Sequence, residues 1–173
     1  SHFDITPHAN FFNSGGFVPK TKAKLVTAIN LWTAGTINAN TDIQSSDTEF
    51  SDGSQGTGNF GYIGNWNVSQ IDDMKDLFKD KTGFNDFIGN WDVSNVTTME
   101  SMFRNAAAFN KDISQWDVSQ VTSMGYMFLG ATDFNQPIGQ WNVSAVTIMY
   151  LMFYDATAFN QPIGQWNVSA VTN

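Results

Sequence analysis

Apolar residues return at a fixed interval of 25 positions over most of this chain. Five tryptophans mark the interval, namely Trp66, Trp91, Trp116, Trp141 and Trp166. Eight positions are identical in all four complete copies, and in the second copy they are Trp91, Val93, Ser94, Met99, Phe103, Phe109, Asn110 and Ile113. A period of this size indicates stacked repeats, in which each unit buries its apolar face against its neighbours. Residues 62–173 are therefore predicted to form four complete coils and a truncated fifth within one structural domain.

The two halves of the repeat have different apolar periods. Ile113, Trp116 and Val118 have the spacing of the strand in leucine-rich repeats, and polar residues alternate with them. The next apolar residues are separated by 3, 3, 1 and 3 positions, a helical stripe made of Val121, Met124, Met127, Phe128 and Ala131. The pattern predicts an α/β repeat solenoid, leucine-rich-repeat-like, with a short parallel strand and a short helix in each coil.

The segment before the repeats has the pattern of a terminal cap. Thr21 is a plausible N-cap and Gly35 a natural helix stop, and between them one face carries Leu25, Ala28, Ile29 and Trp32. The first coil of a stack would otherwise expose its apolar face to water. Residues 3–35 are therefore predicted to form an N-terminal cap with a helix.

Residues 36–61 are rich in Gly, Ser, Asn and Asp and predict a polar loop or insertion. Three carboxylates in this loop, Asp47, Glu49 and Asp52, are weak candidates for calcium ligands. Their spacing does not match the EF-hand pattern, so a solvated acidic loop is the favoured interpretation.

The charge distribution argues against anionic partners. The net charge is −8, Lys111 is the last basic residue, and the segment 112–173 contains four acids. Binding to nucleic acid or to an anionic membrane requires Lys and Arg, so neither is expected. The chain has no cysteine, which excludes disulfides and thiolate metal sites. No apolar run approaches the roughly 18 residues of a membrane span.

Polar columns of the repeat offer a few candidate sites. Residues beside the predicted strand would form a polar strand face that could bind a ligand, made of Asp92, Gln115, Asp117, Gln140 and Asn142. Stacked carboxylates at Asp92 and Asp117 could hold a cation, although exposed carboxylates also tolerate this spacing in water. The asparagines at the same position of each copy are expected to bond turn backbone, and the tryptophans to lie in the core.

No arrangement of residues predicts catalysis. The two histidines lie near the start of the chain, and the carboxylates and serines recur with the repeat without converging. The expectation is a protein that is not an enzyme and needs no cofactor, with calcium left as an open possibility.

One face of the predicted helix changes character along the stack. It is charged in the first copy, with Lys75, Asp76 and Lys79, and becomes aromatic and aliphatic in the last two. A contiguous group of exposed apolar residues indicates a contact surface. Either a partner or a neighbouring domain or copy could cover it. The residues expected to lie together and at least partly exposed are Tyr126, Leu129, Tyr150, Leu151 and Tyr154.

The repeat, WDVSxVTxMxxMFxxAxxFNxxI, resembles the bacterial surface-protein repeat grouped with BspA-like leucine-rich repeats. The segment FVPKTKAKLVTAINLW resembles the one that precedes these repeats, so the resemblance covers residues 17–34 and 61–173. It implies a cell-surface or secreted protein used in adhesion or recognition, and it supplies no catalytic residues.

These observations favour a non-enzymatic binding module that recognises a protein, peptide or glycan. Two alternatives stay open: a structural spacer in a larger surface protein, and a calcium-dependent carbohydrate-binding module. The sequence stops at Asn173, where the next predicted helix would begin. The expectation is that the natural protein continues, and that an open end could associate with another copy.

Overall fold

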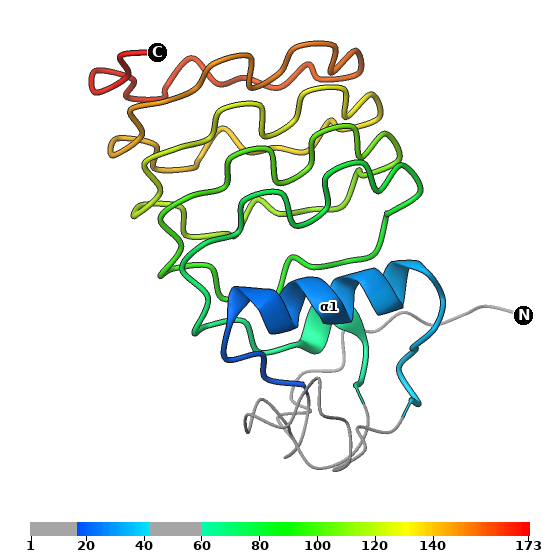
Figure 1. Ribbon diagram of the computed structural model, residues 1–173. Helices are drawn as coiled ribbons and strands as arrows, with labels where there is room; N and C mark the ends of the chain where they lie inside the picture. The colour runs from blue at the N-terminus through cyan, green and yellow to red at the C-terminus, as the bar shows by residue number, and fades with distance from the viewer. Residues whose placement is uncertain (1–16, 42–59) are drawn as a thin grey trace, which may run out of the picture.

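The computed structural model describes residues 17–41 and 60–173. Its two helical elements are the α-helix α1, Lys22–Thr33, and the short 3-10 helix η2, Ile63–Asn65. Figure 1 shows α1 lying across one end of a stack of irregular coils, with the C-terminus at the opposite end. Within this described part, no helix is long and apolar enough to cross a membrane.

The helix α1 forms where the sequence predicts it. The Thr21 side chain accepts a hydrogen bond from the Lys24 backbone N–H at 3.3 Å, which satisfies one donor of the first turn. Gly35 follows the helix in the left-handed region, with φ +72°, which glycine adopts at little cost. The residues that α1 buries against the first coil are Leu25, Ala28 and Ile29.

The predicted α/β leucine-rich-repeat solenoid is wrong. From residue 66 to 173 the described chain contains no helix and no strand, and the Ile113–Val118 segment that was expected to be a strand is irregular backbone with a turn at residues 114–115. Parallel pairing is limited to single bridges that join Asp73, Thr98, Ser123 and Ile148 from coil to coil. These bridges fall at the start of the segment that was expected to be helical.

Backbone hydrogen bonds in that segment alternate between two directions. The Ser101 N–H donates to Gly125 O of the next coil at 2.9 Å, and the Phe103 N–H to Met127 O at 2.9 Å. Between them, the Met102 N–H bonds back to Met99 O within its own coil at 3.1 Å. The same alternation recurs in the neighbouring coils. About half of the amides in the segment therefore hold coils together instead of building a helix.

Left-handed residues explain why no helix forms. Four residues at equivalent places in successive coils have positive φ, at 64°, 55°, 58° and 49° in Asp76, Ser101, Tyr126 and Leu151. A second set of equivalent residues, four positions later in each coil, also has positive φ. An α-helix needs the right-handed region at every residue, so each of these positions ends it. Consecutive three-residue turns bring apolar residues to the core at intervals similar to those of a helix, which is why the sequence pattern could not separate the two.

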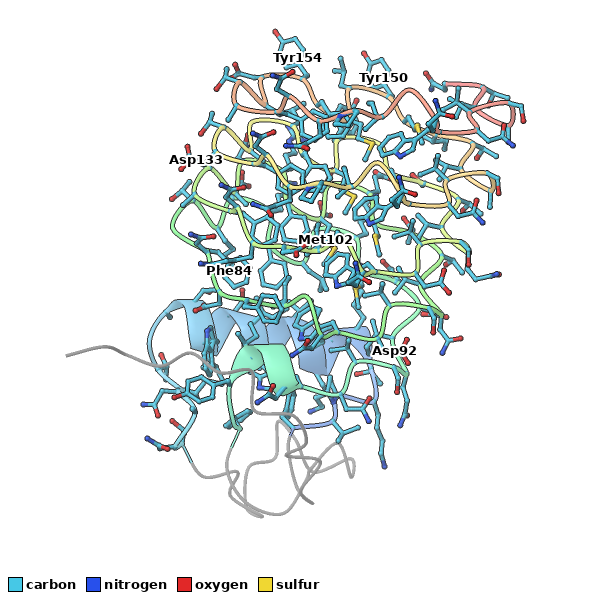
Figure 2. All side chains as sticks on the ribbon, turned by 180° about the vertical axis from the view of Figure 1, so that it is seen from behind. Phe84, Asp92, Met102, Asp133, Tyr150 and Tyr154 are labelled. Carbon is cyan, nitrogen blue, oxygen red and sulfur yellow. The ribbon has the colours of Figure 1, made fainter. Side chains whose placement is uncertain are left out.

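Identical side chains stack in ladders through the core (Figure 2). Phe103 lies 5.6 Å from Phe128 of the next coil, with the rings 3° from parallel, and 4.0 Å from Phe109 of its own coil. Tryptophans form a second ladder and are buried in the first four coils. From Trp91 onward, each tryptophan of this ladder also donates its Nε1–H to a carbonyl of the preceding coil, as Trp116 does to Ile88 O at 3.2 Å. The predicted burial of the tryptophans is therefore confirmed there.

Candidate functional site

We name five residues of the last two complete coils the tyrosine patch: Tyr126, Leu129, Tyr150, Leu151 and Tyr154. Tyr154 is 63% exposed, Tyr150 45% and Leu151 38%, whereas Tyr126 and Leu129 are half-buried. Figure 2 shows Tyr150 and Tyr154 projecting away from the coil at the C-terminal end of the stack. All five side chains thus remain at least partly accessible.

The patch is joined by a direct contact between coils. The Tyr126 and Tyr150 rings meet edge to face, with centroids 5.3 Å apart and planes at 85°. This geometry is favourable for two aromatic rings and fixes one tyrosine against the other. The backbone supports the same pairing, because the Tyr126 N–H donates to Tyr150 O at 2.8 Å.

A cation extends the tyrosine patch toward the preceding coil. The Arg104 guanidinium carbon lies 5.6 Å from the Tyr126 ring centroid, within cation–π range. Arg104 occupies the same place in its coil as Leu129 does in the next and Tyr154 in the one after. Arg104 was not joined to the patch in the sequence analysis. Its position in the same column as Leu129 and Tyr154 is the feature of the sequence that could have indicated it.

Arg104 differs from the other cations of this face in having no acceptor. Within residues 17–41 and 60–173, its guanidinium makes no hydrogen bond or ion pair, and its Nε is buried without a partner. Lys75, by contrast, donates to Glu100 at 2.8 Å, and this hydrogen bond raises the pKa of Lys75. Lys79 lies 3.8 Å from Asp76. At the charged end of the face, each lysine therefore has a carboxylate nearby, whereas no described carboxylate lies near Arg104.

The predicted polar strand face is a column of capped turns instead of a strand. Asp92 Oδ1 accepts hydrogen bonds from the Ser94 N–H at 3.1 Å and the Ser94 hydroxyl at 2.6 Å. Asn142 accepts the same pair from Ser144. Such bonds stabilise an Asx turn, in which the accepting side-chain oxygen can belong to either Asp or Asn. The turns explain the Asp and Asn side chains structurally but not the two glutamines, and all five residues are exposed: Asp92, Gln115, Asp117, Gln140 and Asn142.

Asp117 forms the same turn with Ser119, and the hydrogen bonds of this turn change the pKa of its carboxyl. Hydrogen bonds from the Ser119 hydroxyl and backbone N–H, the latter at 3.0 Å, lower the pKa of the Asp117 carboxyl. These donors favour the charged form, which is the cause of the shift.

The metal candidates find no support. Asp47, Glu49 and Asp52 lie outside the described residues. Among the residues that are described, no group of three or more His, Cys, Asp or Glu side chains could hold a metal ion.

The asparagine column bonds backbone, as the sequence predicts. Asn85 Oδ1 accepts the Asn110 N–H at 3.0 Å, and Asn110 Oδ1 accepts the Asn135 N–H at 3.0 Å. The location of the backbone partner differs from the expectation, because each asparagine side chain bonds an N–H of the next coil. Gln136 strengthens the column by donating to Asn110 Oδ1 at 2.7 Å.

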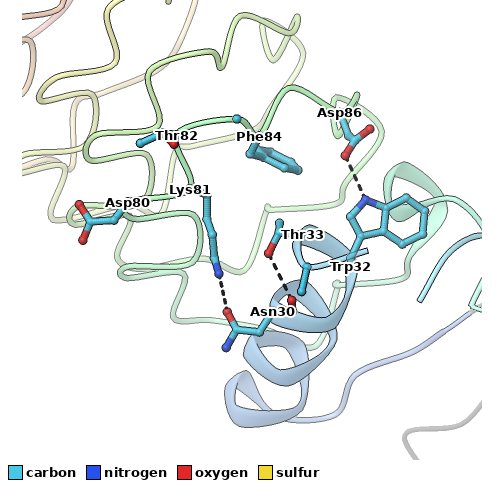
Figure 3. A pocket seen from close by; sticks show the side chains of 10 residues that line it. Asn30, Trp32, Thr33, Asp80, Lys81, Thr82, Phe84 and Asp86 are labelled. Carbon is cyan, nitrogen blue, oxygen red and sulfur yellow. Dashed lines mark hydrogen bonds between the residues drawn. The ribbon is translucent and has the colours of Figure 1, made fainter. Parts of the chain in front are cut away.

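A groove of about 470 Å³ lies between the C-terminal end of α1 and the first coil (Figure 3). Two hydrogen bonds cross it: Lys81 Nζ donates to Asn30 Oδ1 at 2.8 Å, and Trp32 Nε1 donates to Asp86 Oδ2 at 3.0 Å. Its polar side chains thus fasten the cap to the stack. Sequence reasoning gave no indication of this groove, since it depends on how α1 is placed.

Together these features define a capped repeat protein: its coils are joined by backbone bonds and side-chain ladders, and its variable residues lie outside. Residues 44–141 and 86–173 match the family described as "Mycoplasma protein of unknown function, DUF285". The chain belongs to this family. No curated protein and no solved structure matches it.

Proposed function

We propose that this chain is a non-enzymatic recognition module of a cell-surface or secreted protein, which binds a protein or peptide through the tyrosine patch. The observation that carries the proposal is the exposed, contiguous group of Tyr150, Leu151 and Tyr154, continued by Tyr126. The resemblance of the repeat to BspA-like surface proteins supports the location. The family description assigns no function.

The composition of the patch favours a macromolecular partner. Single exposed apolar residues are normal on a protein surface, but a group spread over adjacent coils is not. Tyrosine and arginine are enriched at protein interfaces, because each offers a large contact area and a polar end. The earlier coils carry charged side chains at the same places, so the repeat itself does not demand aromatic residues there.

A structural spacer is the second candidate, and the continuous ladders favour it. Inter-coil bonds and stacked rings run through the described coils, as a rigid rod requires. A spacer has no need of an exposed aromatic group, so the patch separates the two functions.

The test is selection of displayed peptides on the immobilised protein, followed by affinity measurement on variants. Peptides selected on the parent should bind Tyr150→Ser/Tyr154→Ser at least about tenfold more weakly, as loss of central aromatic contacts predicts. The control pair, Gln115→Ser/Gln140→Ser, changes two exposed residues outside the tyrosine patch and should leave affinity unchanged. Equal binding to the parent and the tyrosine pair would contradict the proposal.

A further inference from the structure

We propose that Arg104 is the anchor for a carboxylate of the partner, with Tyr126 and Leu129 receiving an apolar side chain beside it. This inference rests on the proposed function, since it names the chemistry that the tyrosine patch recognises. The partner segment would carry an Asp or Glu next to a leucine-like residue.

The first argument is the charge balance of the outer face. Lys22, Lys75 and Lys79 each have a carboxylate within 4.0 Å, at Asp73, Glu100 and Asp76 respectively. Arg104 has none in the part of the chain that the structure describes. It is the one cation beside the patch whose counter-ion the described chain does not supply.

The second argument is the burial of the guanidinium. Arg104 is half-buried and its Nε has lost contact with water without gaining an acceptor. Leaving a charged donor in this state is costly, and the ring of Tyr126 compensates for only part of it. Because Nε is covered, the two terminal nitrogens are the atoms that a ligand can reach. They present parallel N–H groups, which match the two oxygens of one carboxylate.

The third argument concerns which anion fits. The chain carries a net charge of −8, so a polyanion or a dianionic phosphate is repelled more strongly than a single carboxylate. Tyr126 and Leu129 lie on the following coil and are half-buried and largely apolar. They favour a carboxylate that is flanked by an apolar side chain over a free hydrated anion.

The experiment compares two blocked tripeptides, Leu-Asp-Leu and Leu-Asn-Leu, by NMR titration of the Arg104 side-chain N–H and the Tyr126 ring signals. The Asp peptide should bind about tenfold more tightly, the range expected for a charge-assisted hydrogen bond. Arg104→Gln should abolish the preference. Arg104→Lys should retain only part of it, because an ammonium cannot form the planar pair.

Lys79→Gln is the matched control, since Lys79 occupies the same column one coil earlier and already has Asp76 nearby. It should leave the preference unchanged. Thermal melts of all variants establish that they are folded.

Three results would overturn the inference. The first is equal affinity for the two peptides, and the second is equally tight binding of inorganic sulfate, which would indicate a general anion site. The third is self-association of the parent that Arg104→Gln removes, which would make a second copy the partner. Failure of the proposed function is distinguishable, because Tyr150→Ser/Tyr154→Ser would then leave the binding of library-selected peptides unchanged.

Discussion

At the residue scale, the tryptophan column has two structural roles. Its rings fill the core, and from Trp91 onward each Nε1–H donates to an isoleucine carbonyl of the coil below, as in Trp116 to Ile88 O at 3.2 Å and Trp141 to Ile113 O at 3.2 Å. Burial follows from the sequence pattern. The hydrogen bond does not, because it depends on how far each coil is displaced along the stack. Any substitution of a tryptophan therefore affects two coils.

Replacement of Trp116 separates the two roles. Trp116→Ala should lower the free energy of unfolding by roughly 3–5 kcal/mol, as truncation of a large buried aromatic does. Trp116→Phe keeps a ring but leaves Ile88 O bonded to the Trp91 N–H alone, and should cost less than the alanine change. Urea denaturation of the three proteins measures both effects. A loss below about 1 kcal/mol in the alanine variant would contradict the burial that the structure shows.

Asp117 predicts a pH effect in acid. Its folded pKa is lowered by the Ser119 hydrogen bonds, so its stabilising contribution is present above the unfolded value of about 3.9 and is lost as pH falls through the folded pKa. Asp117→Asn keeps the turn, because Asn142 occupies the same place in the next coil. The stability difference between parent and variant should therefore shrink as pH is lowered from about 5 to about 2. A difference that is constant over this range would mean that the carboxylate is not stabilised in the fold.

At the scale of the element, the structure shows where the apolar pattern is ambiguous. The helix α1 was predictable because its cap, apolar face and glycine stop agree. The repeat segment has helical spacing, and Ser101, Tyr126 and Leu151 give no sign of their left-handed conformation. The second left-handed column does carry a signal, because its residues are of types that favour this region: Asp80, Asn105, Gly130 and Asp155. Bonds such as Ser101 N–H to Gly125 O hold that conformation, and they come from a neighbouring coil. Local sequence alone could not reveal them.

Substitution of Ser101 distinguishes the turns from a helix. Ser101 has φ 55°, a region where a Cβ costs about 1 kcal/mol. Ser101→Gly should therefore be more stable than Ser101→Ala by about 1 kcal/mol. In a helix the order would be reversed by a similar amount. Thermal unfolding of the pair decides between them, and a more stable alanine variant would count against the left-handed backbone.

At the scale of the whole molecule, the repeat predicted the stack and the outward side chains, but not the internal geometry of a coil. The tyrosine patch was found by comparing copies, since residues that vary at a fixed place need not serve the core. Arg104 was missed because its importance lies in the absence of an acceptor among residues 17–41 and 60–173. That can be seen only after Lys75 and Lys79 are placed beside their carboxylates.

The alternating bonds also give the stack an electrical polarity. The N–H groups of residues such as Ser101, Phe103 and Asn105 all point toward the next coil, whereas the fewer amides that point back to the preceding coil, such as Thr122 to Thr97 O and Asp133 to Ala107 O, lie on either side of this segment. Aligned peptide dipoles add, as they do in an α-helix, whereas neighbouring strands of an antiparallel sheet cancel one another. Within this segment the peptide dipoles therefore add, with their positive ends directed toward the coil of Tyr150 and Tyr154. In an acidic protein, these positive ends create a local potential to which a negatively charged group is drawn before any contact is made.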